Sequence, residues 1–107
     1  MNFINKTVIV TGSARGIGRI IAEKFAAQDA NVVISDLDQE QTDTVAGEIS
    51  DGAGRAVGIK ANVTKLDDIV SLFEKTRKEF GQIDIVVNNA GITRDTLMIR
   101  MDEKDWD

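Results

Sequence analysis

The chain has no cysteine and no histidine among its 107 residues. Without cysteine it can form neither a disulfide nor a thiolate metal site. Without histidine it lacks the commonest metal ligand and the usual general base. We therefore expect no metal site. Tyrosine and proline are absent as well.

Basic residues are the minority, with 13 Lys and Arg against 18 Asp and Glu and a net charge of −5. This sign disfavours nucleic acid and anionic membranes as partners, because both need a basic face. The one dense basic group is explained by a solvated helix face and consists of Lys75, Arg77 and Lys78.

Targeting and membrane segments are also missing from the pattern. No apolar run approaches the roughly 20 residues of a membrane span, and residues 1–6 lack the basic and apolar regions of a signal peptide. We expect a cytoplasmic protein. With 42% apolar and 29% charged residues, the composition is typical of a globular chain, and the length predicts one domain over residues 1–107.

Short β-rich runs alternate with segments of helical period. We predict strands at residues 7–10, 31–35, 56–59 and 83–87 and helices at 16–28 and 64–81, with a further helix between Asp38 and the glycines Gly52 and Gly54. Strands that alternate with helices imply a parallel sheet with right-handed crossovers. The predicted fold is α/β: half of a Rossmann fold, with a four-stranded parallel sheet in the order 3-2-1-4 flanked by helices, in a flavodoxin-like topology. Ligands then bind at the carboxyl ends of the first and fourth strands.

Capping residues and apolar spacing predict the ends and faces of the helices. Asp38 can cap the second helix, Thr64 with Asp67 resembles a capping box at the third, and Gly81 is a C-cap. The predicted apolar faces comprise Ile17, Ile20, Ile21 and Phe25 in the first helix and Leu66, Ile69, Val70, Phe73 and Phe80 in the third.

The sharpest local signal lies between the first strand and the first helix, in the segment Thr11-Gly12-Ser13-Ala14-Arg15-Gly16-Ile17-Gly18. Glycines here let the backbone turn sharply, let a diphosphate approach the amides and let the helix pack closely on the strand. The helix start supplies free N–H groups and partial positive charge to an anion. The spacing is G-x-x-x-G-x-G, so a plain glycine-rich turn is the alternative, while a Walker-type loop is excluded by the lack of Gly-Lys-Ser/Thr.

A carboxylate follows the second strand directly, at Asp36, 18 residues beyond Gly18. At this point it can accept hydrogen bonds from a ribose hydroxyl pair and repel a 2′-phosphate. Its alternative is a turn or cap aspartate, although Asp38 is the better cap. Arg15 suits a phosphate, or is simply a solvated loop arginine. Because the Asp36 carboxylate and a 2′-phosphate would repel each other at close range, we give Asp36 more weight than Arg15. We therefore predict NAD as cofactor, with NADP as the alternative.

Two weaker signals follow the fourth and third strands. Asn88-Asn89-Ala90-Gly91 can tie adjacent loops together and expose main-chain acceptors to a ribose, although these are also ordinary turn residues. Asn62-Val63 can clamp an adenine, and a lead-in to the next helix is an equally good interpretation.

The glycine-rich segment and the Asn88–Gly91 motif, about 70 residues apart, together resemble the short-chain dehydrogenase/reductase family, as its N-terminal half. The stretch from Gly91 to Trp106 is similar to its bacterial 3-oxoacyl-acyl-carrier-protein reductases. The resemblance implies NAD(P)H-dependent reduction of a 3-oxoacyl thioester. Those reductases usually prefer NADPH, and Asp36 departs from that pattern. The family also more often has Asp where this chain has Asn62.

The resemblance also implies a role for each matching residue. The diphosphate and adenosine side would be held by Gly12, Ser13, Arg15, Gly16, Ile17 and Gly18. Asp36 would hold the adenine ribose, and Asn62 and Val63 the adenine. The nicotinamide-side ribose would be approached by Asn89, Ala90 and Gly91.

Family members are more than twice as long, and their catalytic Ser, Tyr and Lys lie beyond the position of Asp107. The chain contains no tyrosine, so we assign no catalytic residue here and its status as an enzyme stays open. Three hypotheses follow. The chain binds the dinucleotide without turnover, or it is a structural or engineered half-fold without useful ligand affinity, or it is an oxidoreductase only when another chain complements it.

One mechanical expectation concerns the edge of the sheet. If the fourth strand ends the sheet, Ile83, Ile85 and Val87 lie on an unpaired edge, and such an edge templates another chain. We therefore expect a homodimer or a strand-swapped assembly through this edge. Residues 92–107 would lack the helix that they lead into, and we expect them to be disordered or docked elsewhere.

Overall fold

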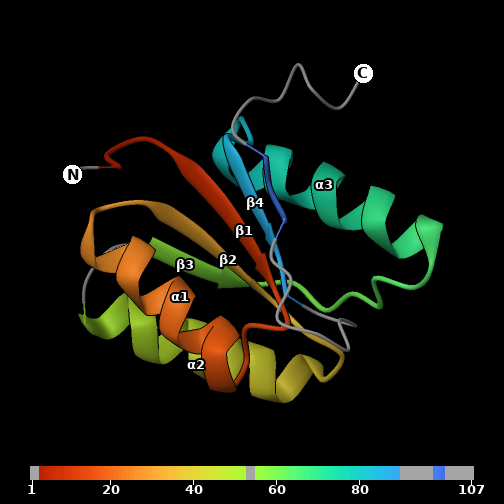
Figure 1. The fold of residues 1–107 in the computed structure, drawn as a ribbon, viewed down its shortest axis with the longest axis horizontal. Coiled ribbons are helices and arrows are strands. Elements are labelled where there is room, and N and C mark those ends of the chain that lie inside the picture. The colour runs from red at the N-terminus through yellow and green to blue at the C-terminus, as the bar shows by residue number, and fades with distance from the viewer. Residues whose placement is uncertain (1–2, 53–54, 90–97, 101–107) are drawn as a thin grey trace.

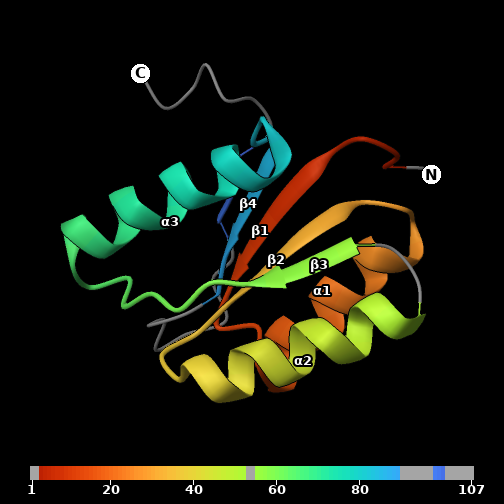
Figure 2. The same cartoon turned by 180° about the vertical axis from the view of Figure 1, so that it is seen from behind.

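The computed structural model describes residues 3–52, 55–89 and 98–100. Within this part the chain forms one twisted sheet with helices on both faces (Figures 1 and 2). The elements are, in chain order, β1 (Thr7–Thr11), α1 (Gly16–Ala27), β2 (Asn31–Ser35), α2 (Gln39–Gly52), β3 (Arg55–Gly58), α3 (Leu66–Phe80), β4 (Ile85–Asn88) and β5 (Met98–Arg100). None of the helices in these ranges combines the length and the hydropathy needed to cross a bilayer.

The sheet has the order β3-β2-β1-β4-β5, and its first four strands are parallel. The predicted order 3-2-1-4 and the α/β class are confirmed. The central strand is buried on both faces, since Val8, Ile9 and Val10 have no exposed surface. Their alternate side chains serve two cores, one beneath α1 and α2 and one beneath α3, and Figure 1 shows the helices divided in this way.

The outer edge of β4 differs from the prediction. β5 pairs antiparallel with β4, with Val87 opposite Ile99 and Asn88 opposite Met98. The expectation of an unpaired edge is therefore wrong, because a segment of the same chain occupies the hydrogen-bonding groups that a second copy would need. The proposed dimer contact through this edge loses its basis. The expectation for residues 92–107 lies outside the described residues, except at β5.

Of the three predicted end signals of α2 and α3, two are present and one is not. Asp38 accepts a hydrogen bond from the Gln41 amide at 3.0 Å, as an N-cap does. Gly81 is left-handed, with φ of 87°, and its amide donates to the Arg77 carbonyl at 2.7 Å, as a C-cap does. The predicted capping box is wrong: α3 begins after Lys65 without a side-chain cap. The Thr64 hydroxyl donates to Asn62 Oδ1 at 2.6 Å instead.

The predicted apolar faces of α1 and α3 are buried only in part. Four of their members pack against the cores: Ile21, Phe25, Phe73 and Phe80. Ile17 and Ile20 are 61% and 54% exposed, and Leu66 is 74% exposed. The residues of α1 that contact the sheet most closely are small and consist of Gly18, Ala22 and Ala26. Small side chains let the helix axis approach the strands. The face of α1 that packs most closely on the sheet is therefore built from small residues instead of the large apolar ones.

In α3 the face toward the sheet is centred on Leu72, which is 2% exposed and packs with Ile9 and Val33. We expect Leu72→Ala to lower the free energy of unfolding by about 2–5 kcal/mol, because it removes buried methyl groups and leaves a cavity. Leu66→Ala, the same substitution on the exposed side of α3, should change it by no more than about 0.5 kcal/mol. Urea denaturation of both variants measures the difference. Equal losses would contradict the orientation of α3.

Candidate functional site

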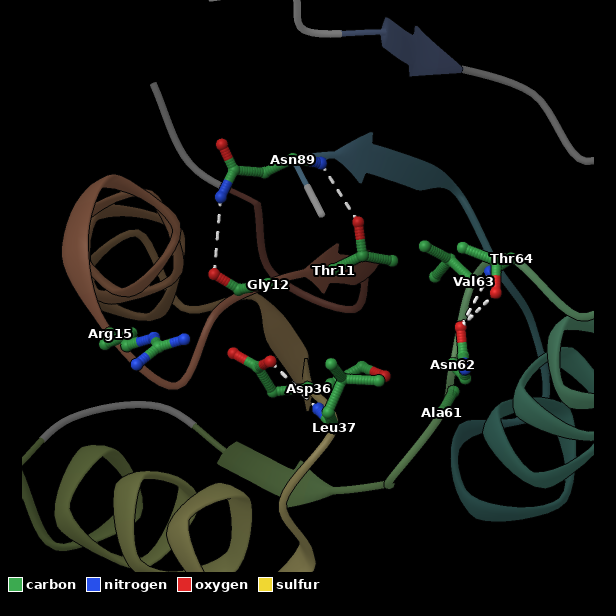
Figure 3. A pocket seen from close by; sticks show the side chains of 11 residues that line it. Thr11, Gly12, Arg15, Asp36, Leu37, Ala61, Asn62, Val63, Thr64 and Asn89 are labelled. Atoms are coloured by element: carbon green, nitrogen blue, oxygen red, sulfur yellow. Dashed lines mark hydrogen bonds between the residues drawn. The ribbon is translucent and has the colours of Figure 1, made fainter. Parts of the chain in front are cut away.

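A cavity of about 290 Å³ lies at the carboxyl ends of the parallel strands, where β1, β2 and β4 open next to the start of α1 (Figure 3). This is the edge of an open α/β sheet at which ligands bind. The volume is at the lower end of the roughly 300–1,000 Å³ found for small-molecule sites. The cavity is lined by Thr11, Gly12, Arg15, Ser35, Asp36, Leu37, Ala61, Asn62, Val63, Thr64 and Asn89.

The bend from β1 into α1 depends on glycine at three positions. Gly12 and Gly16 have φ of 63° and 62°, in the left-handed region that favours glycine. Gly18 is required for space, since a Cβ there would lie 2.1 Å from the Gly12 carbonyl oxygen. The same oxygen accepts a hydrogen bond from Asn89 Nδ2 at 3.3 Å. The bend, the first turn of α1 and the end of β4 therefore meet at one carbonyl group.

The start of α1 has the features of an anion site. Its N-cap is Arg15, which makes no side-chain capping bond, and no acidic residue lies in the first turn. The first amides of a helix have no partner within it and carry partial positive charge. Gly16, Ile17 and Gly18 form this first turn, directly behind Arg15 and Gly12 on the cavity wall. The arrangement can hold a negatively charged group without displacing an existing cap.

Ser13 lies inside the protein rather than on the cavity wall. It has no exposed surface, its hydroxyl donates to the Val10 carbonyl at 2.6 Å, and the same oxygen accepts the Ser35 amide at 2.9 Å. The Ser13 amide donates to the Ser35 carbonyl at 3.1 Å. These bonds fasten the bend to the end of β2, so the side chain of Ser13 positions the loop.

Asp36 is half-buried at the end of β2 and faces the cavity, as does Arg15 (Figure 3). Each of its carboxylate oxygens accepts a main-chain hydrogen bond. Oδ2 accepts the Ala14 amide at 3.2 Å, and Oδ1 accepts the Leu37 amide at 2.8 Å. The Asp36 carbonyl accepts the Ala61 amide at 3.0 Å. Asp36 therefore links the bend, the end of β2 and the segment after β3.

The predicted residues after β3 and β4 reach the same cavity. Asn62 and Val63 form its wall opposite the bend, and Asn62 Oδ1 accepts hydrogen bonds from both the amide and the hydroxyl of Thr64. The Asn62 amide donates to Asp68 Oδ2 at 2.8 Å. On the other side the Asn89 amide donates to Thr11 Oγ1 at 2.9 Å. Ala90 and Gly91 lie outside the described residues.

Sequence reasoning missed five lining residues: Thr11, Ser35, Leu37, Ala61 and Thr64. One of them carried a signal, since Leu37 is a large apolar residue directly after Asp36, near the carboxyl end of β2. In the structure it is 61% exposed. A large exposed apolar side chain in that position is suited to cover a flat ring. In the parts of the chain that the structure describes, no group of three acidic residues is placed to hold a metal ion.

The residues present fit a dinucleotide. The uncapped helix start suits a diphosphate, the Asp36 carboxylate suits ribose hydroxyls, and Leu37 with Val63 offers apolar surface to a purine. Each of these features is local to the strand ends, so the fit does not depend on the net charge of the chain.

Comparison with known proteins shows the family. The family model for short chain dehydrogenases matches residues 6–107. The 3-oxoacyl-[acyl-carrier-protein] reductase FabG of Escherichia coli is 48% identical over 99% of this chain, which spans 42% of that protein. The corresponding Thermotoga maritima reductase is 40% identical over the whole chain, which spans 44% of it. The crystal structure of a hydroxysteroid dehydrogenase from Escherichia coli is 34% identical, with a TM-score of 0.81, over 84% of this chain and 37% of that one.

The chain thus covers less than half the length of these relatives. It belongs to the short chain dehydrogenase family.

Proposed function

We propose that this chain binds NAD in the cavity at the strand ends, with the diphosphate against the start of α1. The observation that carries the proposal is the uncapped first turn of α1, which follows the left-handed Gly12, begins at the left-handed Gly16 and borders the cavity. Main-chain amides fixed in this way bind a diphosphate without reorganising. A polar carboxylate and an apolar wall complete the site.

We assign the parts of the ligand to residues from the positions of the residues around the cavity. The main chain from Gly12 to Gly18 holds the diphosphate, and Asp36 holds the adenine ribose. Asn62 and Val63 border the adenine together with Leu37. Asn89, with Ala90 and Gly91 next to it in sequence, leads toward the nicotinamide-side ribose. Ser13 supports the bend from inside.

The reaction that we propose for the site is NAD(P)-dependent reduction of a 3-oxoacyl thioester, because two reductases of that name match this chain over its whole length. The nicotinamide, when bound, supplies the hydride. The residues of this chain bind and orient the cofactor, and none of them is assigned to protonate the substrate, since the sequence has neither tyrosine nor histidine. We infer that the chain alone does not turn over.

A second candidate is a half-fold without useful affinity. It is favoured by the small volume of the cavity, at about 290 Å³. Isothermal titration with NAD and NADP at millimolar concentration separates the two, because the proposed function requires saturable heat and the structural role requires none.

Cofactor preference gives the first test of the site. We expect NAD to bind at least about 10-fold more tightly than NADP, because a 2′-phosphate next to the Asp36 carboxylate places like charges a few ångströms apart, at a cost of about 1–4 kcal/mol. Paired titrations at one salt concentration measure the ratio. Tighter binding of NADP would show that Arg15 dominates, and it would overturn the role given to Asp36.

The glycine contact gives the second test. Gly18→Ala should weaken NAD binding at least about 10-fold, since its Cβ would lie 2.1 Å from the Gly12 carbonyl oxygen and the bend must shift. Gly47→Ala is the matched control: it lies in α2 with nothing within 4 Å of the added carbon. That change should leave binding unaltered and stabilise the fold by about 0.5–1 kcal/mol. Unchanged affinity in Gly18→Ala would contradict the placement of the diphosphate.

Turnover gives the third test. With reduced cofactor and a 3-oxoacyl thioester, the purified chain should oxidise no cofactor above the buffer rate, while the Escherichia coli reductase serves as the positive control. Oxidation by the chain alone would refute our inference. Oxidation that appears only after a second chain carrying a Tyr-x-x-x-Lys motif is added would establish the hypothesis of complementation in its place.

A further inference from the structure

We propose that Asp36 is also a positioning residue: it fixes the shape of the diphosphate-binding bend, so that sugar recognition and anion recognition are coupled through one carboxylate. The inference rests on the proposed function for the ligand side of this coupling. Its structural side rests on the contacts of Asp36 with the protein itself.

The bend is attached to β2 at two consecutive residues. The Ser13 amide donates to the Ser35 carbonyl, and the Ala14 amide donates to Asp36 Oδ2 at 3.2 Å. Ala14 is 2% exposed, so without Asp36 its amide would be left without a partner in a buried position, which is unfavourable. Only this second attachment depends on a side chain that also faces the cavity.

The acceptor capacity of the carboxylate allows both roles at once. An ionised carboxylate has about four lone-pair positions on its two oxygens. The Ala14 and Leu37 amides occupy one on each oxygen. One position per oxygen remains, which matches the two hydroxyls of a ribose. A ribose can therefore bind without releasing the bend, and the bend is already held in place before the ligand arrives.

This arrangement has a consequence for cofactor selectivity. A substitution that removes only the charge of Asp36 should relieve the repulsion of a 2′-phosphate and keep an acceptor for Ala14. A substitution that removes the whole group should release the bend as well. Asp36→Asn and Asp36→Ala differ in this way, since the asparagine side chain retains one carbonyl oxygen.

Amide hydrogen exchange, followed residue by residue in the free protein by NMR, tests the anchoring without any nucleotide. Asp36→Ala should speed exchange of the Ala14 amide at least about 10-fold, and Asp36→Asn should change it less than about 3-fold. Asp38→Ala is the matched control, because Asp38 accepts the Gln41 amide in the same manner. It should speed exchange at Gln41 and leave Ala14 unchanged.

Titrations of the same variants test the coupling. NADP should bind Asp36→Asn at least about 5-fold more tightly than Asp36→Ala, although both lack the charge. Unchanged Ala14 exchange in Asp36→Ala, or equal effects of the two variants, would overturn the inference. If Ala14 responds as expected and the unsubstituted chain binds no dinucleotide, the anchor is supported and the proposed function is the part that fails.

Discussion

The site depends on one close approach, between the first turn of α1 and the carbonyl group of Gly12. There is no room for a Cβ at Gly18, which would lie 2.1 Å from that oxygen, and the same oxygen accepts the side-chain amide of Asn89. Helix, bend and the end of β4 are thereby fixed relative to one another. The amides at the start of α1 gain a defined direction from this contact, and a ligand that meets preorganised donors loses less affinity to the ordering of the protein.

The features that could be predicted from sequence are those that a short stretch of chain determines. A strand covered on both faces is apolar at every position. The run Val8, Ile9 and Val10 therefore predicts a buried strand without knowledge of its neighbours. The caps at Asp38 and Gly81 act on amides and carbonyls within four residues, and both are present. The strand order follows from the alternation of strands and helices with right-handed crossovers. Position after a strand also predicts part of the site. The glycine-rich bend, Asp36, Asn62, Val63 and Asn89 each follow a strand, and the structure brings residues from all of these segments to one cavity.

The features that could not be predicted depend on contacts between distant segments. Spacing gives an apolar face for α1, but close packing on the sheet selects Gly18, Ala22 and Ala26 and leaves Ile17 exposed. Thr64 has the spacing of a cap, yet Asn62 Oδ1 is a competing acceptor two residues away and takes both its amide and its hydroxyl. The pairing of β5 with β4 was not predicted, because the sequence around β5 shows no strand pattern. Leu37 and Ala61 reach the cavity because strands β2 and β3 end side by side, which no local pattern encodes.

The proposed function pairs an acidic chain with an acidic ligand, so the net charge and the local field at the cavity have to be considered separately. The chain carries −5 and a diphosphate is itself negative. At physiological ionic strength, however, charges beyond about 8 Å are largely screened. What the ligand meets within that distance is the positive end of α1, free of acidic residues in its first turn, and the exposed guanidinium of Arg15. The carboxylate of Asp36 lines the same cavity and already accepts two main-chain amides. The distribution of charge along the cavity therefore supports the proposed orientation of a dinucleotide, with phosphate toward the helix and hydroxyls toward the carboxylate, although the net charge of the protein is negative.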